Sequence, residues 1–170
     1  LVDIDEFNSF KTDKRRSEHV SARFALGSIL EKWGLDVDQM KIVRDNNRAP
    51  SLRWLDGLFR SEPLPGISLG HSNGHAVAAV IEPGWWVGID AEPESRKIAL
   101  NALDQFCKGE ELEMLSGRSD EAVKLWTSKE AVQKSMHLGM NLNPRIITFE
   151  NGIPIEEKIY QFSIGNKIIQ

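Results

Sequence analysis

Two carboxylates separated by one residue, Asp90 and Glu92, are the groups whose type and spacing say most about chemistry. They close an apolar run over residues 85–90 that is typical of a strand, and residues two apart in a strand point to the same face. Paired carboxylates repel each other unless a cation lies between them, and Mg²⁺ favours such oxygen ligands together with a substrate phosphate. The pattern therefore predicts a magnesium site at a strand end, although an acidic strand end in solvent has the same sequence.

A second pair, Glu130 and Lys134, lies one helical turn apart within a helix predicted for residues 119–138. On a solvent-facing helix this is an ordinary i,i+4 ion pair that contributes about 0.2–0.5 kcal/mol. Beside a metal, the same carboxylate can accept a proton and the same ammonium can neutralise phosphate charge. The residues by themselves leave both interpretations open.

A third group is basic. Arg16, His19 and Arg23 follow the spacing i, i+3, i+7 and share one face of a helix predicted for residues 13–33. Guanidinium groups bind phosphate oxygens in a bidentate manner, so this face is a candidate anion site. A solvated basic face has the same appearance.

Short elements must position these groups. Asn73-Gly74 between two apolar runs predicts a tight hairpin, because that turn needs positive φ at both central residues. The expected order is a helix over 13–33, a strand over 40–44, a loop over 45–65, hairpin strands over 67–69 and 76–81, a strand over 85–90, helices over about 95–106, 109–116 and 119–138, and strands over 145–149 and 158–164. Antiparallel strands mixed with separate helices indicate the α+β class.

Composition narrows the class of protein. The 170 residues are 41% hydrophobic and 27% charged, which is ordinary for a globular chain. The net charge of −4 and the lack of a basic run disfavour nucleic-acid binding, and no apolar stretch approaches membrane-spanning length. Cys107 is the single cysteine, so no internal disulfide can form, and we expect a cytoplasmic protein.

Three segments, taken in order, resemble the signature of the 4′-phosphopantetheinyl transferase superfamily. Residues 87–92 read Val-Gly-Ile-Asp-Ala-Glu, residues 106–110 read Phe-Cys-Lys-Gly-Glu, and residues 126–134 read Trp-Thr-Ser-Lys-Glu-Ala-Val-Gln-Lys. The family has an apolar-Gly-apolar-Asp-x-Glu strand, then Phe-x-x-x-Glu, then Trp-x-x-Lys-Glu-(Ser/Ala)-x-x-Lys on a helix. Each piece is weak alone, whereas the ordered combination is specific.

The resemblance extends upstream, so that it covers about residues 14–140. Residues 14–23 resemble the Arg-rich first helix of the larger single-chain class that activates siderophore and surfactin synthetases, and Arg48-Ala49-Pro50 matches its basic residue before a Pro. Residues 68–72 resemble its Ser-Ile-Ser-His-Ser hairpin, except that Gly70 replaces the Ser before the His. This departure removes a hydroxyl from the neighbourhood of the pyrophosphate.

The resemblance implies a monomer of two similar α+β halves, each a small antiparallel sheet packed with a long helix. The first half, residues 1–83, would grip the nucleotide of coenzyme A, and the second, residues 84–170, would supply metal and base. A hinge is expected near residues 82–86, with coenzyme A in the cleft between the halves.

The implied activity is that of a holo-[carrier protein] synthase. It moves the 4′-phosphopantetheine moiety of coenzyme A to a serine of an apo acyl, peptidyl or aryl carrier protein and releases 3′,5′-ADP. Mg²⁺ would be held by Asp90, Glu92 and Glu110, with Glu111 the alternative third ligand. Glu130 would be the base.

The remaining roles concern coenzyme A. By the same resemblance, Lys134 would neutralise the pyrophosphate and Lys129 is a weaker candidate. The 3′-phosphate or adenosine would be bound by Arg16, Arg23, Arg48 and His71, together with His19.

Two other functions use the same residues. A different Mg²⁺-dependent phosphate enzyme, such as a nucleotide hydrolase, would release phosphate without a carrier protein. A non-catalytic module would keep the fold and only bind coenzyme A or a carrier protein. The presence of all four groups, Asp90, Glu92, Glu130 and Lys134, favours an enzyme over such a module.

Overall fold

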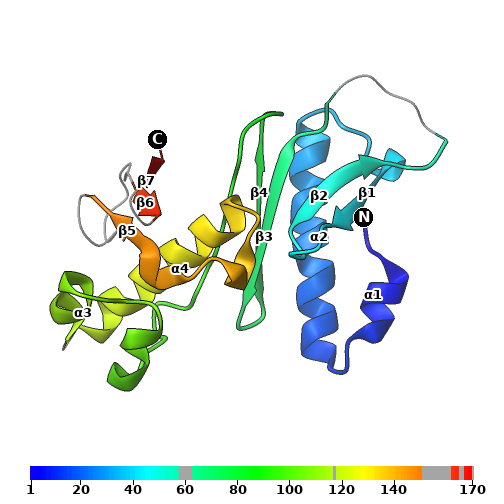
Figure 1. Ribbon diagram of the computed structural model, residues 1–170. Helices are drawn as coiled ribbons and strands as arrows, with labels where there is room; N and C mark the ends of the chain where they lie inside the picture. Colours follow the sequence, from blue (N-terminus) through cyan, green and yellow to red (C-terminus); the bar gives the residue numbers. More distant parts are fainter. Residues whose placement is uncertain (58–62, 117, 151–161, 165–166, 170) are drawn as a thin grey trace.

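The hairpin of β3 (Gly66–Ser72) and β4 (His75–Ile81) forms the edge of the first of two groups of elements in the computed structural model, which describes residues 1–57, 63–116, 118–150, 162–164 and 167–169. In Figure 1, α1, α2, β1 and β2 lie on one side of this hairpin, and α3, α4 and β5–β7 lie on the other. Small antiparallel sheets and separate helices confirm the α+β class. The similarity of the two halves, and the boundary between residues 83 and 84, stay predictions.

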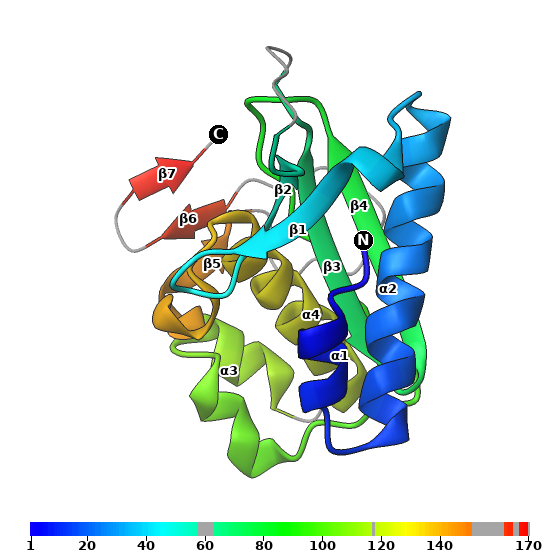
Figure 2. The same ribbon diagram turned by 90° about the vertical axis from the view of Figure 1, so that its right-hand side faces the viewer.

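The first group is built around α2 (Asp13–Lys32). Thr12 caps this helix by accepting a hydrogen bond from the backbone N–H of Arg15, and Gly34, at φ 77°, follows its end. Figure 2 shows α2 lying along β4, with α1 (Ile4–Ser9) beside it. The buried residues that join α2 to the strands are Leu26, Leu30, Met40 and Ile67.

The remaining strands of this group are two antiparallel pairs. β1 (Met40–Arg44) pairs with β2 (Pro50–Trp54), and β3 (Gly66–Ser72) pairs with β4 (His75–Ile81). Asn73 and Gly74 join β3 to β4 with φ of 47° and 81°, the tight turn that the sequence predicts.

Between β4 and the second group, the chain passes α4 (Ser119–Ser135) at very close range. A Cβ added to Gly88 would lie 1.9 Å from the carbonyl oxygen of Ala131, so only glycine fits there. The strand predicted for residues 85–90 is wrong, since these described residues form no ladder. The physical reason is that side chains bind the backbone of Ile89: its N–H donates to Ser68 Oγ and its C=O accepts from Lys134 Nζ.

The second group contains a short 3₁₀ helix (Leu100–Gln105), α3 (Glu110–Leu115) and α4, followed by an antiparallel sheet. Its strands are β5 (Ile147–Phe149), β6 (Phe162–Ile164) and β7 (Lys167–Ile169). The core contains Leu103, Phe106, Cys107, Leu115, Ala122 and Leu125. Burial raises the pKa of Cys107 to about 12, so this thiol is a packing residue rather than a nucleophile.

Several predicted boundaries differ from the structure. The helix over 13–33, the strand over 40–44, the hairpin and the helix over 109–116 are confirmed. α1 and β2 were not predicted, and β2 lies inside the expected loop over 45–65. The helix over 95–106 is reduced to its 3₁₀ part, and α4 ends at Ser135, before the left-handed His137 at φ 56°. Residues 158–161 of the last predicted strand lie outside the described residues.

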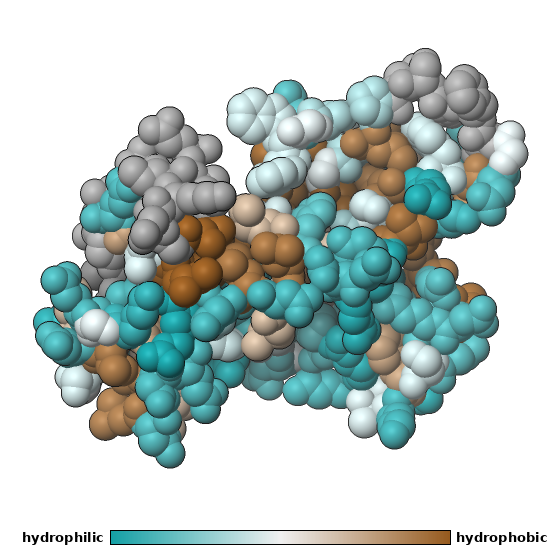
Figure 3. All heavy atoms as spheres, viewed as in Figure 1, coloured by the Kyte–Doolittle hydropathy of each residue, from teal (hydrophilic) through white to brown (hydrophobic). Residues whose placement is uncertain are grey.

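The surface is mostly polar on the face that Figure 3 shows: hydrophilic side chains cover most of its lower part, and hydrophobic ones gather near β5, along β1 and β2, and at the lower left near α3. Within the described ranges, no helix is long and apolar enough to cross a membrane.

The contact at Gly88 generates a prediction about stability. Gly88→Ala should lower the free energy of unfolding by about 1–3 kcal/mol or more, because the added methyl meets backbone rather than a movable side chain. Urea denaturation followed by tryptophan fluorescence measures this change. Gly27→Ala, inside α2, is the matched control. Apart from the backbone of its own helix, its added Cβ has Leu1 Cδ1, at 3.6 Å, as its single close neighbour among the described residues. Equal effects of the two substitutions would contradict the packing described here.

Candidate active site

Asp90 and Lys134 form the centre of the site. Lys134 Nζ lies 2.7 Å from Asp90 Oδ1 and 3.0 Å from the carbonyl oxygen of Ile89. The Asp90 side chain is only 5% exposed, and its second oxygen, Oδ2, is buried with no hydrogen-bond partner among the described residues. A buried carboxylate oxygen without a donor is costly, so this atom is suited to binding a cation.

Glu92, two residues after Asp90 in the chain, is held through both of its oxygens. Ser72 Oγ donates to Oε2 at 2.6 Å, and the guanidinium of Arg96 pairs with Oε1. The Glu92 side chain is 11% exposed. Asp90 and Glu92 are therefore each neutralised by a different basic residue, Lys134 in one case and Arg96 in the other.

Glu130 joins these two carboxylates electrostatically. Burial raises the pKa of Glu130, and the negative charges of Asp90 and Glu92 raise this pKa further, whereas Lys134 and Arg96 lower it. The helix α4 thus places Glu130 within electrostatic range of Asp90 and Glu92, one helical turn before Lys134. A carboxylate with a raised pKa is a stronger proton acceptor once it is ionised.

The segment around α3 behaves differently. Lys129 is fully buried, and its Nζ donates to Glu111 at 2.5 Å and to the carbonyl oxygen of Phe106 at 2.8 Å. Burial raises the pKa of Glu111, and Lys129 opposes this rise. Lys129 and Glu111 thus hold α3 against α4, and Lys129 presents no exposed surface to coenzyme A.

Glu110, the predicted third metal ligand, is exposed in the first turn of α3. In the part of the chain that the structure describes, no three His, Cys, Asp or Glu residues group closely enough to hold a metal ion between them. The role of Glu110 therefore stays a prediction.

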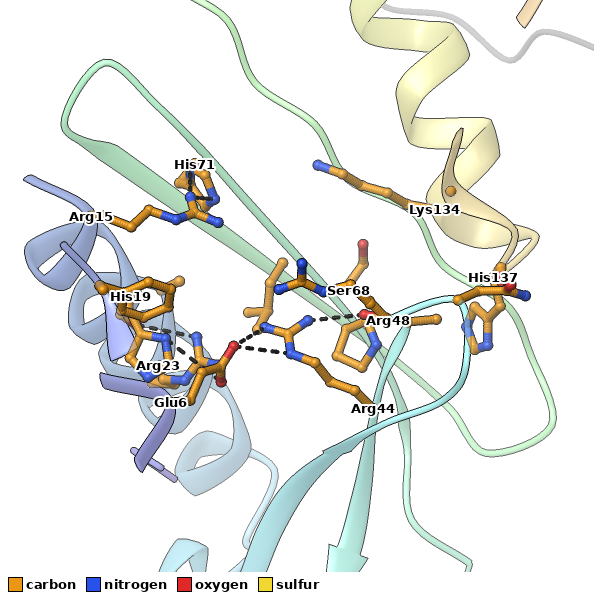
Figure 4. A pocket seen from close by; sticks show the side chains of 17 residues that line it. Glu6, Arg15, His19, Arg23, Arg44, Arg48, Ser68, His71, Lys134 and His137 are labelled. Atoms are coloured by element: carbon orange, nitrogen blue, oxygen red, sulfur yellow. Dashed lines mark hydrogen bonds and ion pairs between the residues drawn. The ribbon is translucent and has the colours of Figure 1, made fainter. Parts of the chain in front are cut away.

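A basic pocket of about 260 Å³ lies next to this acidic centre. It is bounded by α1 and α2 on one side, by the β1–β2 turn and β3, and by the end of α4. Figure 4 shows Lys134 and His137 across the pocket from Glu6 and Arg23. The basic residues that line it are Arg15, Arg23, Arg44, Arg48, Lys134, His19, His71 and His137.

Glu6 is the one carboxylate among the described residues that line this pocket. Its Oε2 lies 2.9 Å from Nη2 of Arg23 and its Oε1 lies 3.1 Å from Nη2 of Arg44, as the dashed lines in Figure 4 indicate. His19 Nδ1 lies 3.8 Å from Glu6 Oε2. Burial lowers the pKa of the His19 imidazole, and the charge of Arg23 lowers this pKa further. Glu6 therefore occupies the guanidinium groups that an anionic ligand would bind.

The basic face of α2 differs by one residue from the predicted one. Arg16 pairs with Asp13 at 2.9 Å and is not among the described residues that line the pocket, whereas Arg15 is. Arg15 Nη1 lies 3.1 Å from His71 Nδ1, and burial, followed by the charge of Arg15, lowers the pKa of His71. The face that meets the pocket thus follows the spacing i, i+4, i+8 from Arg15 through His19 to Arg23.

Sequence reasoning missed the ionisable pocket residues Glu6, Arg15, Arg44 and His137. The i, i+4, i+8 spacing signals Arg15, but nothing in the sequence signals Glu6 or His137. His137 reaches the pocket because α4 ends there, and its carbonyl oxygen accepts from Asn47 Nδ2 at 3.0 Å. Arg48, at φ 66°, lies in the same turn as Asn47.

One protein-family model matches the second half of the chain. The family model described as the 4′-phosphopantetheinyl transferase superfamily matches residues 86–166, the segment that contains Asp90, Glu92, Glu130 and Lys134. No curated protein matches the chain. The match supports this superfamily and a transferase activity, and the larger pseudo-dimeric class stays a prediction.

The position of Glu6 generates a second prediction. Glu6→Gln should raise the affinity for inorganic pyrophosphate by about tenfold, or about 1.4 kcal/mol, because the anion no longer displaces a carboxylate. Without pyrophosphate the variant should melt at a lower temperature than the wild type, since buried Arg23 loses its counter-charge. Titration calorimetry and thermal denaturation measure the two effects.

Asp5→Asn, an exposed change on the same helix, is the matched control for charge. Unchanged or weaker pyrophosphate binding by Glu6→Gln would show that Glu6 does not compete with anions in this pocket.

Proposed function

We propose that this chain transfers the 4′-phosphopantetheine moiety of coenzyme A to a serine of an apo carrier protein and releases 3′,5′-ADP. The observation that carries this proposal is the shared position of Lys134, which lines the basic pocket and also pairs with Asp90 in the acidic centre. A ligand whose 3′-phosphorylated nucleotide is joined to a pyrophosphate, as in coenzyme A, matches that arrangement. The family match supports phosphopantetheinyl transfer in general.

The acidic centre fits Mg²⁺. Asp90 Oδ2 is a buried oxygen without a donor in the described chain, and Glu92 and Glu130 add charge beside it. Mg²⁺ often takes one or two carboxylates and fills its other positions with water and substrate phosphate, so three close protein ligands are not required. When bound by Asp90 and Glu92, the ion would polarise the pyrophosphate and stabilise the departing 3′,5′-ADP.

The chemical step is a displacement at phosphorus. The carrier serine oxygen forms a bond to the phosphorus that bears pantetheine, and the bond from that phosphorus to the 5′-phosphate oxygen of 3′,5′-ADP breaks. Glu130, directly or through water, takes the proton of the serine hydroxyl. Lys134 neutralises charge that develops on the pyrophosphate, so the protein contributes mainly positioning and electrostatics.

The basic pocket would hold the nucleotide end. Arg15, Arg23, Arg44 and Arg48 supply guanidinium groups for the 3′-phosphate, and bidentate contacts to phosphate oxygens suit that geometry. Because Glu6 now pairs with Arg23 and Arg44, binding would exchange one anion for another. His71 and His137 line the same pocket and are candidates for contacts with the adenosine.

The direct test is incubation with coenzyme A, Mg²⁺ and a panel of apo acyl, peptidyl and aryl carrier proteins. Intact mass of the carrier should increase by one phosphopantetheine group, and 3′,5′-ADP should form in equal amount. Release of phosphate from a nucleotide without any carrier would instead favour a hydrolase. Binding of coenzyme A with no product from any carrier would favour a non-catalytic module.

Glu130→Gln separates chemistry from binding. The variant keeps the shape of the side chain and loses its basicity, so transfer should fall by roughly 10²–10⁴ while coenzyme A still binds with similar affinity. Single-turnover transfer at saturating coenzyme A and Mg²⁺ measures the first effect, and calorimetry measures the second. An unaltered rate would exclude Glu130 as the base.

Arg48→Ala tests the nucleotide end. Arg48 is exposed and lines the pocket, so removal of its side chain should weaken the binding of coenzyme A by about tenfold or more without unfolding the protein. Binding of 3′-dephospho-coenzyme A should change much less, because that ligand lacks the 3′-phosphate. Arg53→Ala, an exposed arginine on β2 that is not among the described pocket-lining residues, is the matched control. Equal losses for both ligands would place Arg48 away from the 3′-phosphate.

A further inference from the structure

One face of β3 meets the segment that contains Asp90 and Glu92 at three successive positions. Ser68, Gly70 and Ser72 are two residues apart, so they lie on the same face of the strand. At each of these three positions, the strand either contacts a group in or beside residues 89–92 or leaves room for one. β3 belongs to the first group of elements, whereas the carboxylates lead into the second.

Ser68 holds the backbone of this segment. Its side-chain oxygen accepts from the N–H of Ile89 at 3.0 Å, and the residue is 3% exposed. Because residues 85–90 form no ladder in the described chain, this serine binds a half-buried N–H that a neighbouring strand would otherwise bind. This hydrogen bond fixes the position along β3 of Ile89, the residue before Asp90.

Gly70 leaves space for the ammonium of Lys134. A Cβ at this position would lie 3.3 Å from Lys134 Nζ and 3.2 Å from the carbonyl oxygen of Ile89. Both atoms belong to the hydrogen bond that brings Lys134 to the segment. A side chain at position 70 would therefore press on the lysine that neutralises Asp90.

Ser72 orients Glu92. Its hydroxyl donates to Oε2 at 2.6 Å, while Arg96 holds the other oxygen from the solvent side. A short hydrogen bond to a carboxylate is among the stronger ones in proteins. With Arg96 on Oε1, this bond holds both oxygens of the Glu92 carboxylate.

We propose that this face of β3 is a positioning surface for the proposed reaction: Ser72 positions Glu92 for the metal, and Gly70 gives Lys134 its position beside Asp90. The inference rests on the proposed function, because it assigns these residues to the metal and phosphate groups of that site. It also gives Gly70 a physical role in place of the missing hydroxyl, since a serine there would meet the ammonium.

The first test removes the hydroxyl of Ser72. Ser72→Ala should weaken Mn²⁺ binding, read by electron paramagnetic resonance in the presence of coenzyme A, by roughly 10–100-fold, the usual effect of losing a partner of a metal ligand. Ser72→Thr keeps the hydroxyl and should restore most of the affinity. Ser128→Ala removes a serine hydroxyl from the outer part of α4 and should leave Mn²⁺ binding unchanged.

The outcomes separate this inference from the proposed function. If the wild-type protein binds Mn²⁺ and Ser72→Ala binds it equally well, the role of Ser72 is wrong and the function is unaffected. If the wild-type protein binds no Mn²⁺ with coenzyme A, the proposed metal site fails, and the role of Ser72 fails with it.

The second test is a double-mutant cycle between positions 70 and 134. Gly70→Ala should weaken coenzyme A binding several-fold in the wild-type background and have little effect when Lys134 is already methionine, because the two changes act on one contact. The added methyl would also approach Val77 Cγ2 at 3.0 Å. Equal losses in both backgrounds would mean that Gly70 serves packing against Val77 and the carbonyl oxygen of Ile89 rather than the position of Lys134, and the proposed role of Gly70 would be overturned.

Discussion

The contact of Lys134 with Asp90 and with the carbonyl oxygen of Ile89 is the interaction on which the site depends. It joins α4 to a segment that has no strand partner in the described chain, and it places one ammonium between the acidic centre and the basic pocket. Gly88 makes the contact possible, because only a residue without Cβ lets the backbone come so close to α4. A lysine that already bridges both regions suits a ligand that must span them.

Internal counter-charges neutralise both regions of the site. Arg96 and Lys134 hold the carboxylates Glu92 and Asp90, and Glu6 holds the guanidinium groups of Arg23 and Arg44. Buried charges are costly unless they are paired, so this arrangement lets the protein keep a highly charged cavity folded. Under the proposed function, binding of coenzyme A would be an exchange of partners, and its free energy would be a difference between two sets of ion pairs.

The match between predicted and observed elements follows the range of the interactions involved. The hairpin at Asn73-Gly74 and the helix after Thr12 depend on a few neighbouring residues, and both were predictable. β2 was missed because its pairing with β1 outweighs the turn-like composition of the surrounding residues. The strand predicted for residues 85–90 was wrong for a related reason: Trp85 and Trp86 are exposed, and side chains rather than a neighbouring strand bind the backbone of Ile89.

The sequence by itself determined which chemical groups are present and how neighbours along the chain relate. The close spacing of Asp90 and Glu92, and the helical turn between Glu130 and Lys134, are local properties of the backbone. Only the tertiary structure decided that Arg15 rather than Arg16 meets His71, that Ser72 binds Glu92, and that Glu6 enters the basic pocket. These contacts join residues far apart in the chain, so they depend on how whole elements pack, which local spacing does not specify.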